Sequence, residues 1–228
     1  SGEAMGLRQS FNKFTEVLVP LIFGTVGSAV GIGAAFWMDA ALLAGGKVIL
    51  LSGPSPVFRF SMLLAAAEAA RGGTLAIIDG CNRFDIHLLT RFARERALNA
   101  DGLLARVFLS RGFTCYQMEA AVTRKLLPFL ESAGSSKAMI FGLLDTLYDE
   151  QATLRETEQI LRRVQEAIAE LRAREVSVLL TCKEWNVLPR ERNAFLHRLK
   201  GSADSVFRLQ LQEHHPPRLF RERRGIHH

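Results

Sequence analysis

The stretch Lys47–Asp85, KVILLSGPSPVFRFSMLLAAAEAARGGTLAIIDGCNRFD, decides the fold that the sequence predicts. Two short apolar runs, typical of buried strands, flank a segment rich in Ala and Leu that favours a helix. A strand, a helix and a second strand in this order form a βαβ unit. The sequence therefore predicts an α/β fold with a mainly parallel sheet flanked by helices. The expected segments are a strand at Val48–Ser52, a loop at Gly53–Phe60, a helix at Ser61–Arg71 and a strand at Thr74–Asp79.

The loop after the first strand occupies the place of a phosphate-binding loop, whose pattern is G-x-x-x-x-G-K-[ST]. Gly53 opens the pattern, Arg59 stands where the Lys belongs, and Ser61 follows one position after the place of the Ser/Thr. These three are the candidate nucleotide-binding residues, as the remnant of such a loop. Pro54 and Pro56 each remove a backbone N–H donor that would hold phosphate. The alternative is an ordinary turn between strand and helix that never held phosphate.

The composition is that of a globular protein. The chain has 228 residues, of which 48% are hydrophobic, enough for one α/β domain with a sizeable core. A net charge of +6 and a pI near 9.6 permit an anionic partner without requiring one. Cys81, Cys115 and Cys182 lie far apart and form no C-x-x-C pair, so we expect reduced thiols and a cytoplasmic location. We expect no metal site.

The N-terminal segment is long and apolar. Val17–Met38 contains 22 residues without a formal charge, which is long enough to span a bilayer. Pro20 and several glycines interrupt it, and we favour a buried piece of a globular fold over a membrane span, although both residue types also occur in membrane helices. The predicted organisation is an apolar, Gly-rich segment at 1–33, one core domain at 34–224 and a tail at 225–228.

Further strands and helices follow in alternation. The clearest helix is Gln151–Arg174, in which large apolar residues form one stripe. Pro128 is expected to end the preceding helix, and two runs around Pro216–Pro217 predict an antiparallel C-terminal hairpin. The other expected strands are Ala105–Ser110, Ala138–Leu144, Val176–Thr181, Ser205–Gln212 and Arg218–Arg223, and the other expected helices are Asp85–Glu95 and Tyr116–Leu127, with a loop at Asn99–Gly102.

Four stretches in this order resemble the RecA/RadA/KaiC superfamily of ATPase-fold proteins. Ala34–Lys47 resembles the helix and Gly-Gly turn before that family's Walker A strand, and Val48–Asp79 resembles its P-loop unit. Val107–Val122, VFLSRGFTCYQMEAAV, is similar to the strand and helix that carry R-A-F-T-x-Y-Q in recombinases, and is the most specific match. Ala138–Glu150, AMIFGLLDTLYDE, is similar to the Walker B strand and its continuation. The resemblance implies a single RecA-like domain that ends in the C-terminal hairpin.

The resemblance does not extend to the family's catalytic positions. Phe58 and Phe60 replace the second glycine and the Mg²⁺-binding Ser/Thr of the P-loop. Cys81 stands where the family has a Glu that activates water, Gly142 stands at the Walker B Asp, and Cys182–Lys183 replaces the phosphate sensor. A thiol is a poor general base, and a glycine offers no carboxylate to the ion. We therefore predict that the protein is not an enzyme, has no catalytic residues, and uses neither ATP nor Mg²⁺ as a cofactor.

A basic segment follows the last predicted core strand. In RecA-like proteins the matching segment is a DNA-binding loop, and here it is Glu184–Ala203. Trp185 and Phe195 lie among its cations, where aromatic rings could stack on bases. The alternative is a solvated amphipathic helix, with Phe195 and Leu199 packed inward. The candidate DNA-binding residues, which would neutralise phosphates, are Arg190, Arg192, Arg198 and Lys200.

Several functions follow from these observations. The first is a catalytically inactive RecA-fold protein that acts as a DNA-binding or assembly subunit in DNA recombination and repair. Its expected partners are DNA, which we expect to be single-stranded, and another RecA-fold subunit, with no membrane. The second is a nucleotide-dependent ATPase with a non-standard site built from Arg59 and Asp145. The third is a KaiC-like regulator that acts through protein contacts alone.

Overall fold

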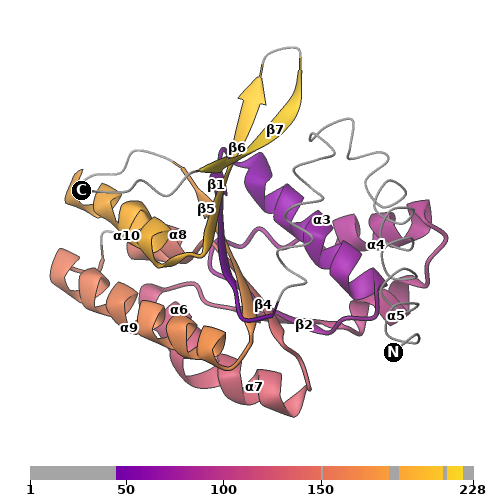
Figure 1. Ribbon diagram of the computed structural model, residues 1–228, viewed down its shortest axis with the longest axis horizontal. Coiled ribbons are helices and arrows are strands. Elements are labelled where there is room, and N and C mark those ends of the chain that lie inside the picture. The colour runs from indigo at the N-terminus through magenta and orange to yellow at the C-terminus, as the bar shows by residue number, and fades with distance from the viewer. Residues whose placement is uncertain (1–44, 150, 185–189, 213–214, 223–228) are drawn as a thin grey trace, which may run out of the picture.

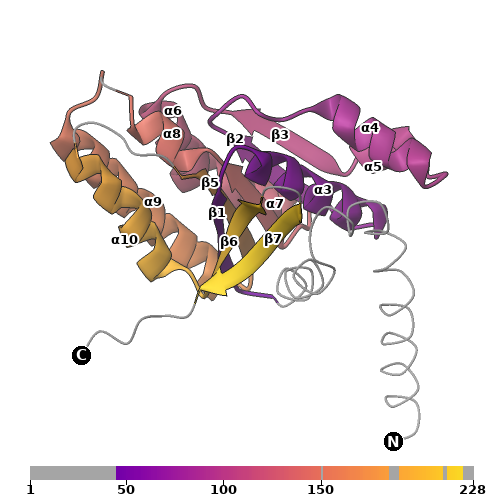
Figure 2. The same ribbon diagram turned by 90° about the horizontal axis from the view of Figure 1, so that it is seen from above.

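The computed structural model describes residues 45–149, 151–184, 190–212 and 215–222. These residues form one seven-stranded sheet with helices on both faces (Figures 1 and 2). The predicted segments 1–33 and 225–228, and the apolar stretch Val17–Met38, lie outside the described residues. The strands are β1 (Val48–Gly53), β2 (Leu75–Asp79), β3 (Val107–Arg111), β4 (Lys137–Phe141), β5 (Ser177–Lys183), β6 (Ser205–Gln212) and β7 (His215–Glu222).

The sheet is mainly parallel, as the sequence predicts. Its strand order is β3-β2-β4-β5-β1-β6-β7. All neighbouring strands from β3 to β6 are parallel, and β7 pairs antiparallel with β6. The predicted C-terminal hairpin is therefore confirmed, and it extends the sheet beyond β1.

The two faces of the sheet bury separate cores. Alternate side chains of the strands point to opposite faces, so Ile49 and Leu51 of β1 pack on one side while Val48 and Leu50 pack on the other. The helices α3 (Pro56–Ala70), α4 (Ile86–Glu95) and α5 (Ala100–Leu104) cover the first face (Figure 2). The second face is covered by α6 (Cys115–Ala120), the π-helical turn Ala121–Lys125, α7 (Leu126–Ser132), α8 (Leu143–Leu147), α9 (Leu154–Ala173) and α10 (Ala194–Ser202).

The structure confirms the apolar stripe that the sequence predicts for helix α9. Its buried side chains are Thr157, Ile160, Leu161, Val164, Ile168 and Leu171. A capping box fixes its start: the backbone N–H of Thr153 donates to Glu156 Oε2 at 2.9 Å, and the N–H of Glu156 donates to Thr153 Oγ1 at 3.3 Å. No helix among the described residues has the length and apolar character that crossing a membrane requires.

Helix α3 begins earlier than predicted. The sequence favours a loop to Phe60, but the helix starts at Pro56, so that only Pro54 and Ser55 separate it from β1. A proline suits the first position of a helix, because its missing N–H would have no partner there and its φ is already helical. Phe58 and Phe60 then become core residues, each 3% exposed.

The helix before β4 passes through Pro128 instead of ending there. The segment turns from α to π geometry at Ala121–Lys125 and continues as α7 to Ser132. A proline clashes with the carbonyl of the residue four positions earlier, which here is Arg124 within the π turn. The wider turn thus accommodates Pro128. The predicted loop at Asn99–Gly102 is also partly helical, because the Asn99 side chain accepts two backbone N–H groups at the start of α5.

Strand β4 is shorter than predicted. It ends at Phe141, and Gly142 takes a left-handed conformation with φ of +64° before α8 begins. Only glycine adopts this conformation without steric cost. The consequence is that Asp145 lies on α8 and not at the end of a strand, where a Walker B carboxylate would lie.

The C-terminal ends of β1 and β5 define a place where a ligand can bind. The chain leaves β1 towards α3 on one face, whereas it leaves β5 towards α10 on the other. In open α/β sheets such a divergence creates a crevice at the carboxyl ends of the strands, and ligands bind there. A nucleotide bound by the predicted residues Gly53, Arg59 and Ser61 would lie at this edge of the sheet.

Candidate functional site

The turn after β1 is packed against β6. Gly53 has φ of +151°, and a Cβ built on it would lie 2.7 Å from the carbonyl oxygen of Leu209. The Gly53 carbonyl accepts the backbone N–H of Glu184 at 2.8 Å. Gly53 is therefore required for close contact between the end of β1 and its two neighbours, and its backbone carbonyl is already bonded within the chain.

The other two candidate nucleotide residues point away from this turn. Ser61 is fully buried, donates to the Val57 carbonyl at 3.1 Å and shares a hydrogen bond of 2.7 Å with Thr181 Oγ1. It thus joins α3 to β5. Arg59 is exposed and lines a hollow between α3 and α4. The structure does not bring Gly53, Arg59 and Ser61 together around one ligand position.

Asp79, at the end of β2, is bonded by its own loop. Its carboxylate is fully buried and accepts backbone N–H groups of Cys81 at 3.1 Å, Arg83 at 3.2 Å and Phe84 at 2.9 Å. The Cys81 thiol donates to the same carboxylate at 3.4 Å. Both carboxylate oxygens therefore hold the loop in shape.

Cys81 and Gly142 stand at the two positions where the resemblance to RecA-like proteins leads one to expect a Glu and an Asp, and their surroundings do not suit acidic residues. Burial raises the pKa of the Cys81 thiol, and the carboxylates of Asp79 and Asp145 raise it further. The residue is thus a neutral thiol and a weak base. A Cβ on Gly142 would lie 2.6 Å from Cys81 Sγ and 3.0 Å from the Cys81 backbone nitrogen. An aspartate cannot stand at Gly142 unless this loop moves.

The carboxylate of Asp145 has less of its hydrogen-bonding capacity satisfied than the other carboxylates of this region. Its Oδ2 is buried without a hydrogen-bond partner among the described residues. Burial raises the pKa of its carboxyl group, whereas its backbone hydrogen bond and the cations of Lys183 and Arg83 lower it. Among the described residues, no group of three or more His, Cys, Asp or Glu side chains is arranged to hold a metal ion.

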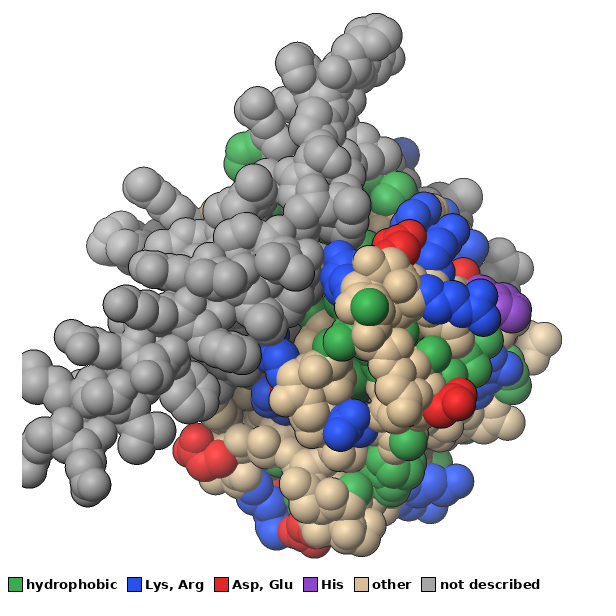
Figure 3. All heavy atoms as spheres, turned by 90° about the vertical axis from the view of Figure 1, so that its right-hand side faces the viewer, with side chains coloured by type: hydrophobic (Ala, Val, Ile, Leu, Met, Phe, Trp, Pro, Cys, Tyr) green, Lys and Arg blue, Asp and Glu red, His purple; other side chains and the backbone are tan. Residues whose placement is uncertain are grey.

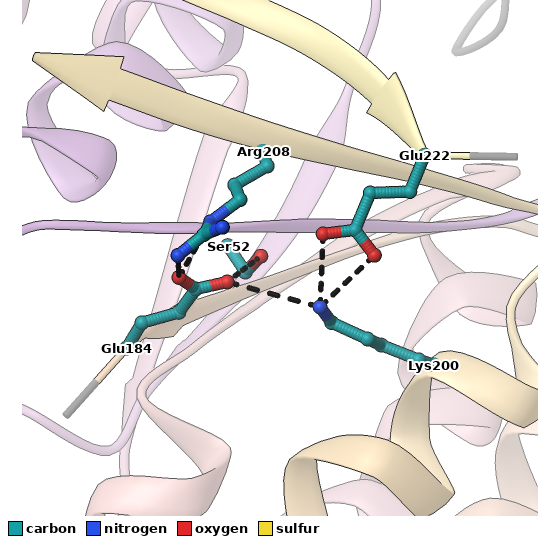
Figure 4. Close-up of polar contacts among 5 residues, drawn as sticks. All are labelled: Ser52, Glu184, Lys200, Arg208 and Glu222. Atoms are coloured by element: carbon teal, nitrogen blue, oxygen red, sulfur yellow. Dashed lines mark hydrogen bonds and ion pairs between the residues drawn. The ribbon is translucent and has the colours of Figure 1, made fainter. Parts of the chain in front are cut away.

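A balanced ion network lies at the ends of β1 and β5, on the side of β6 (Figure 4). Glu184, just after β5, accepts the Ser52 hydroxyl at 2.7 Å and the Arg208 guanidinium at 2.7–2.8 Å. Lys200 of α10 lies 3.8 Å from Glu184 and donates to both oxygens of Glu222 at 2.9 Å. Two cations and two carboxylates thus neutralise each other across the ends of β1, β5, β6 and β7. The sequence prediction missed this network, because its members are far apart in the chain.

Arg192, a candidate DNA-binding residue, is buried in the interior of the protein. Its side chain is 3% exposed, and its guanidinium donates to the carbonyl oxygens of Leu147 at 3.0 Å, Asp149 at 2.6 Å and Ala152 at 2.5 Å. These bonds tie the end of α8 to the start of α9. An arginine buried in this way cannot reach a phosphate in solution, and it is not among the contacts proposed below.

The other candidate DNA-binding residues lie on the surface. Arg190 is exposed at the start of a short 3₁₀ helix, Arg190–Asn193. Arg198 pairs with Glu158 at 3.0 Å, and Lys200 belongs to the network of Figure 4. Phosphate must therefore compete with carboxylates for two of these three cations.

The aromatic residues of the same segment do not form a platform for bases. Phe195 is fully buried and stacks on Tyr148, with ring centroids 6.3 Å apart and an interplanar angle of 6°. Leu199 is buried as well, so α10 is the amphipathic helix of the alternative interpretation. Trp185 lies outside the described residues.

An apolar hollow lies at the β3 edge of the sheet, which the sequence prediction did not assign to any function. It has a volume of about 290 Å³ and is bounded by β2, β3 and the helical segment from Ala121 to Phe129. Phe108 and Leu109 are 43% and 38% exposed there, and the Phe108 ring packs on Phe129 at 5.0 Å. A signal was present in the sequence, since β3 begins with three large apolar residues and lies at the edge once the order of strands is known.

No family model matches this chain, and comparison with curated proteins finds no match.

Proposed function

We propose that this chain is a catalytically inactive, RecA-like subunit that acts in DNA recombination or repair by binding DNA and pairing with another subunit of the same fold. The observation that carries the proposal is that polar groups at the carboxyl end of the sheet bond within the chain. Glu184, Ser61 and Asp79 each bond to a neighbouring element or loop there. A cytoplasmic location is part of the proposal, because all three cysteines are free thiols.

The alternative of a non-standard ATPase has less support. It requires Arg59 and Asp145 to act on one nucleotide. Arg59 lines a hollow with residues of α4 on one face of the sheet, whereas α8, which carries Asp145, packs on the other face. Phosphoryl transfer depends on cations and a metal-binding carboxylate placed around the same phosphates. A binding role requires no such convergence.

The β3 edge supports the assembly part of the proposal. An edge strand presents unpaired backbone N–H and C=O groups that another chain can pair with. Here the strand also exposes Phe108 and Leu109 beside an apolar hollow. Large exposed apolar side chains next to a cavity are typical of protein interfaces.

A charge placed on this edge tests the assembly. We expect Leu109→Lys to lower the mass that light scattering measures at high protein concentration to 25.3 kDa, the mass of one chain, because a charged edge strand resists pairing. Leu98→Lys is the matched control, since Leu98 is 39% exposed and Leu109 is 38% exposed. A wild-type protein that stays at 25.3 kDa at every concentration contradicts pairing between copies.

Binding of DNA distinguishes the proposed subunit from a KaiC-like regulator. Arg190, with Arg198 and Lys200 after exchange of their carboxylate partners, would supply cations to a phosphate backbone. Salt-dependent binding of a single-stranded oligonucleotide supports the DNA-binding subunit. Absence of any binding favours a protein that acts through protein contacts alone.

A further inference from the structure

The side of the molecule that carries α4 has an arginine-rich surface that the sequence prediction did not recognise. In Figure 3, Lys and Arg side chains gather beside a histidine on the side where α4 and α5 lie in Figure 1. We call this surface the α4 basic face and define it by Arg59, His87, Arg91 and Arg94.

Two adjoining hollows give the α4 basic face its shape. One, of about 160 Å³, is lined by Arg59 of α3, by Arg91 of α4 and by Arg96, which follows α4. The other, of about 420 Å³, is lined by His87, Arg91 and Arg94. Arg91 borders both hollows, so the cations form one continuous surface and not separate points.

The charge of this face is not cancelled locally. The two hollows are lined by four arginines and by two carboxylates, those of Asp85 and Glu95. Asp85 caps α4 by accepting the backbone N–H of His87 at 2.9 Å, and Glu95 pairs with Arg96 at 3.7 Å. Within the part of the chain that the structure describes, Arg59, Arg91 and Arg94 are exposed and form no ion pair.

Several arginines on the opposite side of the sheet are paired. Near α9 and α10, four exposed guanidinium groups hold carboxylates of neighbouring elements, in pairs that span long sequence separations. These pairs are Arg163–Glu119, Arg172–Asp204, Arg174–Glu131 and Arg198–Glu158. Cations that lack such partners are available to an anion from outside.

The geometry points to the backbone of a nucleic acid as the partner of the α4 basic face, and this inference rests on the proposed DNA-binding role. His87, Arg91 and Arg94 are spaced i, i+4 and i+7, so they form a row of about 10 Å along one side of the helix. A row of cations matches an anion that repeats along a chain, and guanidinium groups bind phosphate through two parallel hydrogen bonds.

A lipid surface fits the α4 basic face less well. A helix that lies on a membrane inserts an apolar side into the bilayer. In α4 that side is Leu88, Leu89, Phe92 and Ala93, and it is buried against the core of this protein. Apart from Ile86 at the start of the helix, which is 48% exposed, the surface that α4 leaves for a partner is polar, and this favours phosphates without acyl chains.

The test measures binding of a fluorescent single-stranded oligonucleotide to the full chain over a range of salt concentrations. We expect Arg91→Gln with Arg94→Gln to weaken binding roughly tenfold at low salt, and to reduce the slope of log K against log salt by about 1.4 (0.7 for each lost contact). The matched control is Arg162→Gln with Arg172→Gln, which removes the same charge from exposed cations of α9 that pair with Glu166 and Asp204. We expect its slope to equal that of the wild type. Circular dichroism verifies that each variant is folded, and Arg59→Gln with Arg91→Gln provides a second pair.

Several results would overturn the inference. They are an unchanged slope in both α4 variants, an equal loss in the α9 control, and binding to vesicles of anionic lipid but not to the oligonucleotide. A protein without any affinity for nucleic acid also overturns it. Failure of the proposed function is seen separately, because binding of Mg-ATP contradicts an inactive subunit without changing which arginines set the salt slope.

Discussion

Arg192 joins three pieces of backbone around the end of α8. Its removal leaves the carbonyl oxygens of Leu147, Asp149 and Ala152 without this donor. We expect Arg192→Ala to lower the free energy of unfolding by about 2–4 kcal/mol, because buried acceptors lose charge-assisted hydrogen bonds. Urea denaturation measures the change. The exposed neighbour Arg190→Ala is the control, with an expected change within about 0.5 kcal/mol. Equal midpoints for the two variants would show that Arg192 has no structural role.

Asp145 makes stability depend on pH. Burial raises the pKa of its carboxyl above the ordinary value of 3.8, so the folded protein binds this proton more tightly than the unfolded chain does. The free energy of unfolding therefore falls as pH rises through the raised pKa, and the penalty persists at neutral pH. An asparagine does not titrate and can donate a hydrogen bond.

We expect Asp145→Asn to be more stable than the wild type at pH 7, with an advantage that shrinks as the pH is lowered through the raised pKa and has disappeared well below the ordinary value of 3.8. Urea denaturation of both proteins across this range measures the difference. An advantage that is independent of pH, or that grows towards acid, contradicts a raised pKa of the Asp145 carboxyl.

At the scale of elements, the turn between β4 and α8 depends on a glycine and leaves no room for a carboxylate at that position. We expect Gly142→Ala to destabilise the fold by about 2–4 kcal/mol, the sum of a left-handed conformation and a clash with Cys81. Gly134→Ala separates the two causes, since Gly134 has φ of +60° with nothing within 4 Å of a Cβ. The loss at Gly134 should be about 1–2 kcal/mol. Equal losses at both positions would remove the clash from the explanation.

Elements with strong local signals could be predicted from the sequence. Helix α9 has both a capping box and a regular apolar stripe, and the strands β1, β2, β4 and β5 are short apolar runs buried between helices. The exact ends of the helices were harder to predict, because they depend on single residues whose effect is set by tertiary packing. Pro56 starts a helix because Phe58 and Phe60 have a core to fill, and Pro128 is tolerated because the preceding turn widens.

The candidate site was less predictable than the fold, because its contacts join residues that are distant in sequence. A basic segment gave no sign that Arg192 turns inward, nor that Lys200 bonds to Glu222. Ser61 and Thr181 meet only because α3 crosses β5. The arginines of α3 and α4 form one surface only after both helices pack on the same face.

For the whole molecule, the central claim is that the end of the sheet where a nucleotide would bind is filled by the chain itself. Isothermal titration calorimetry of Mg-ATP at high protein concentration tests it most directly, together with a phosphate-release assay with and without DNA. The account predicts no heat of binding and no turnover, because Asp79, Ser61 and Glu184 bond within the chain. Micromolar affinity, or turnover that disappears in Arg59→Ala, would contradict it.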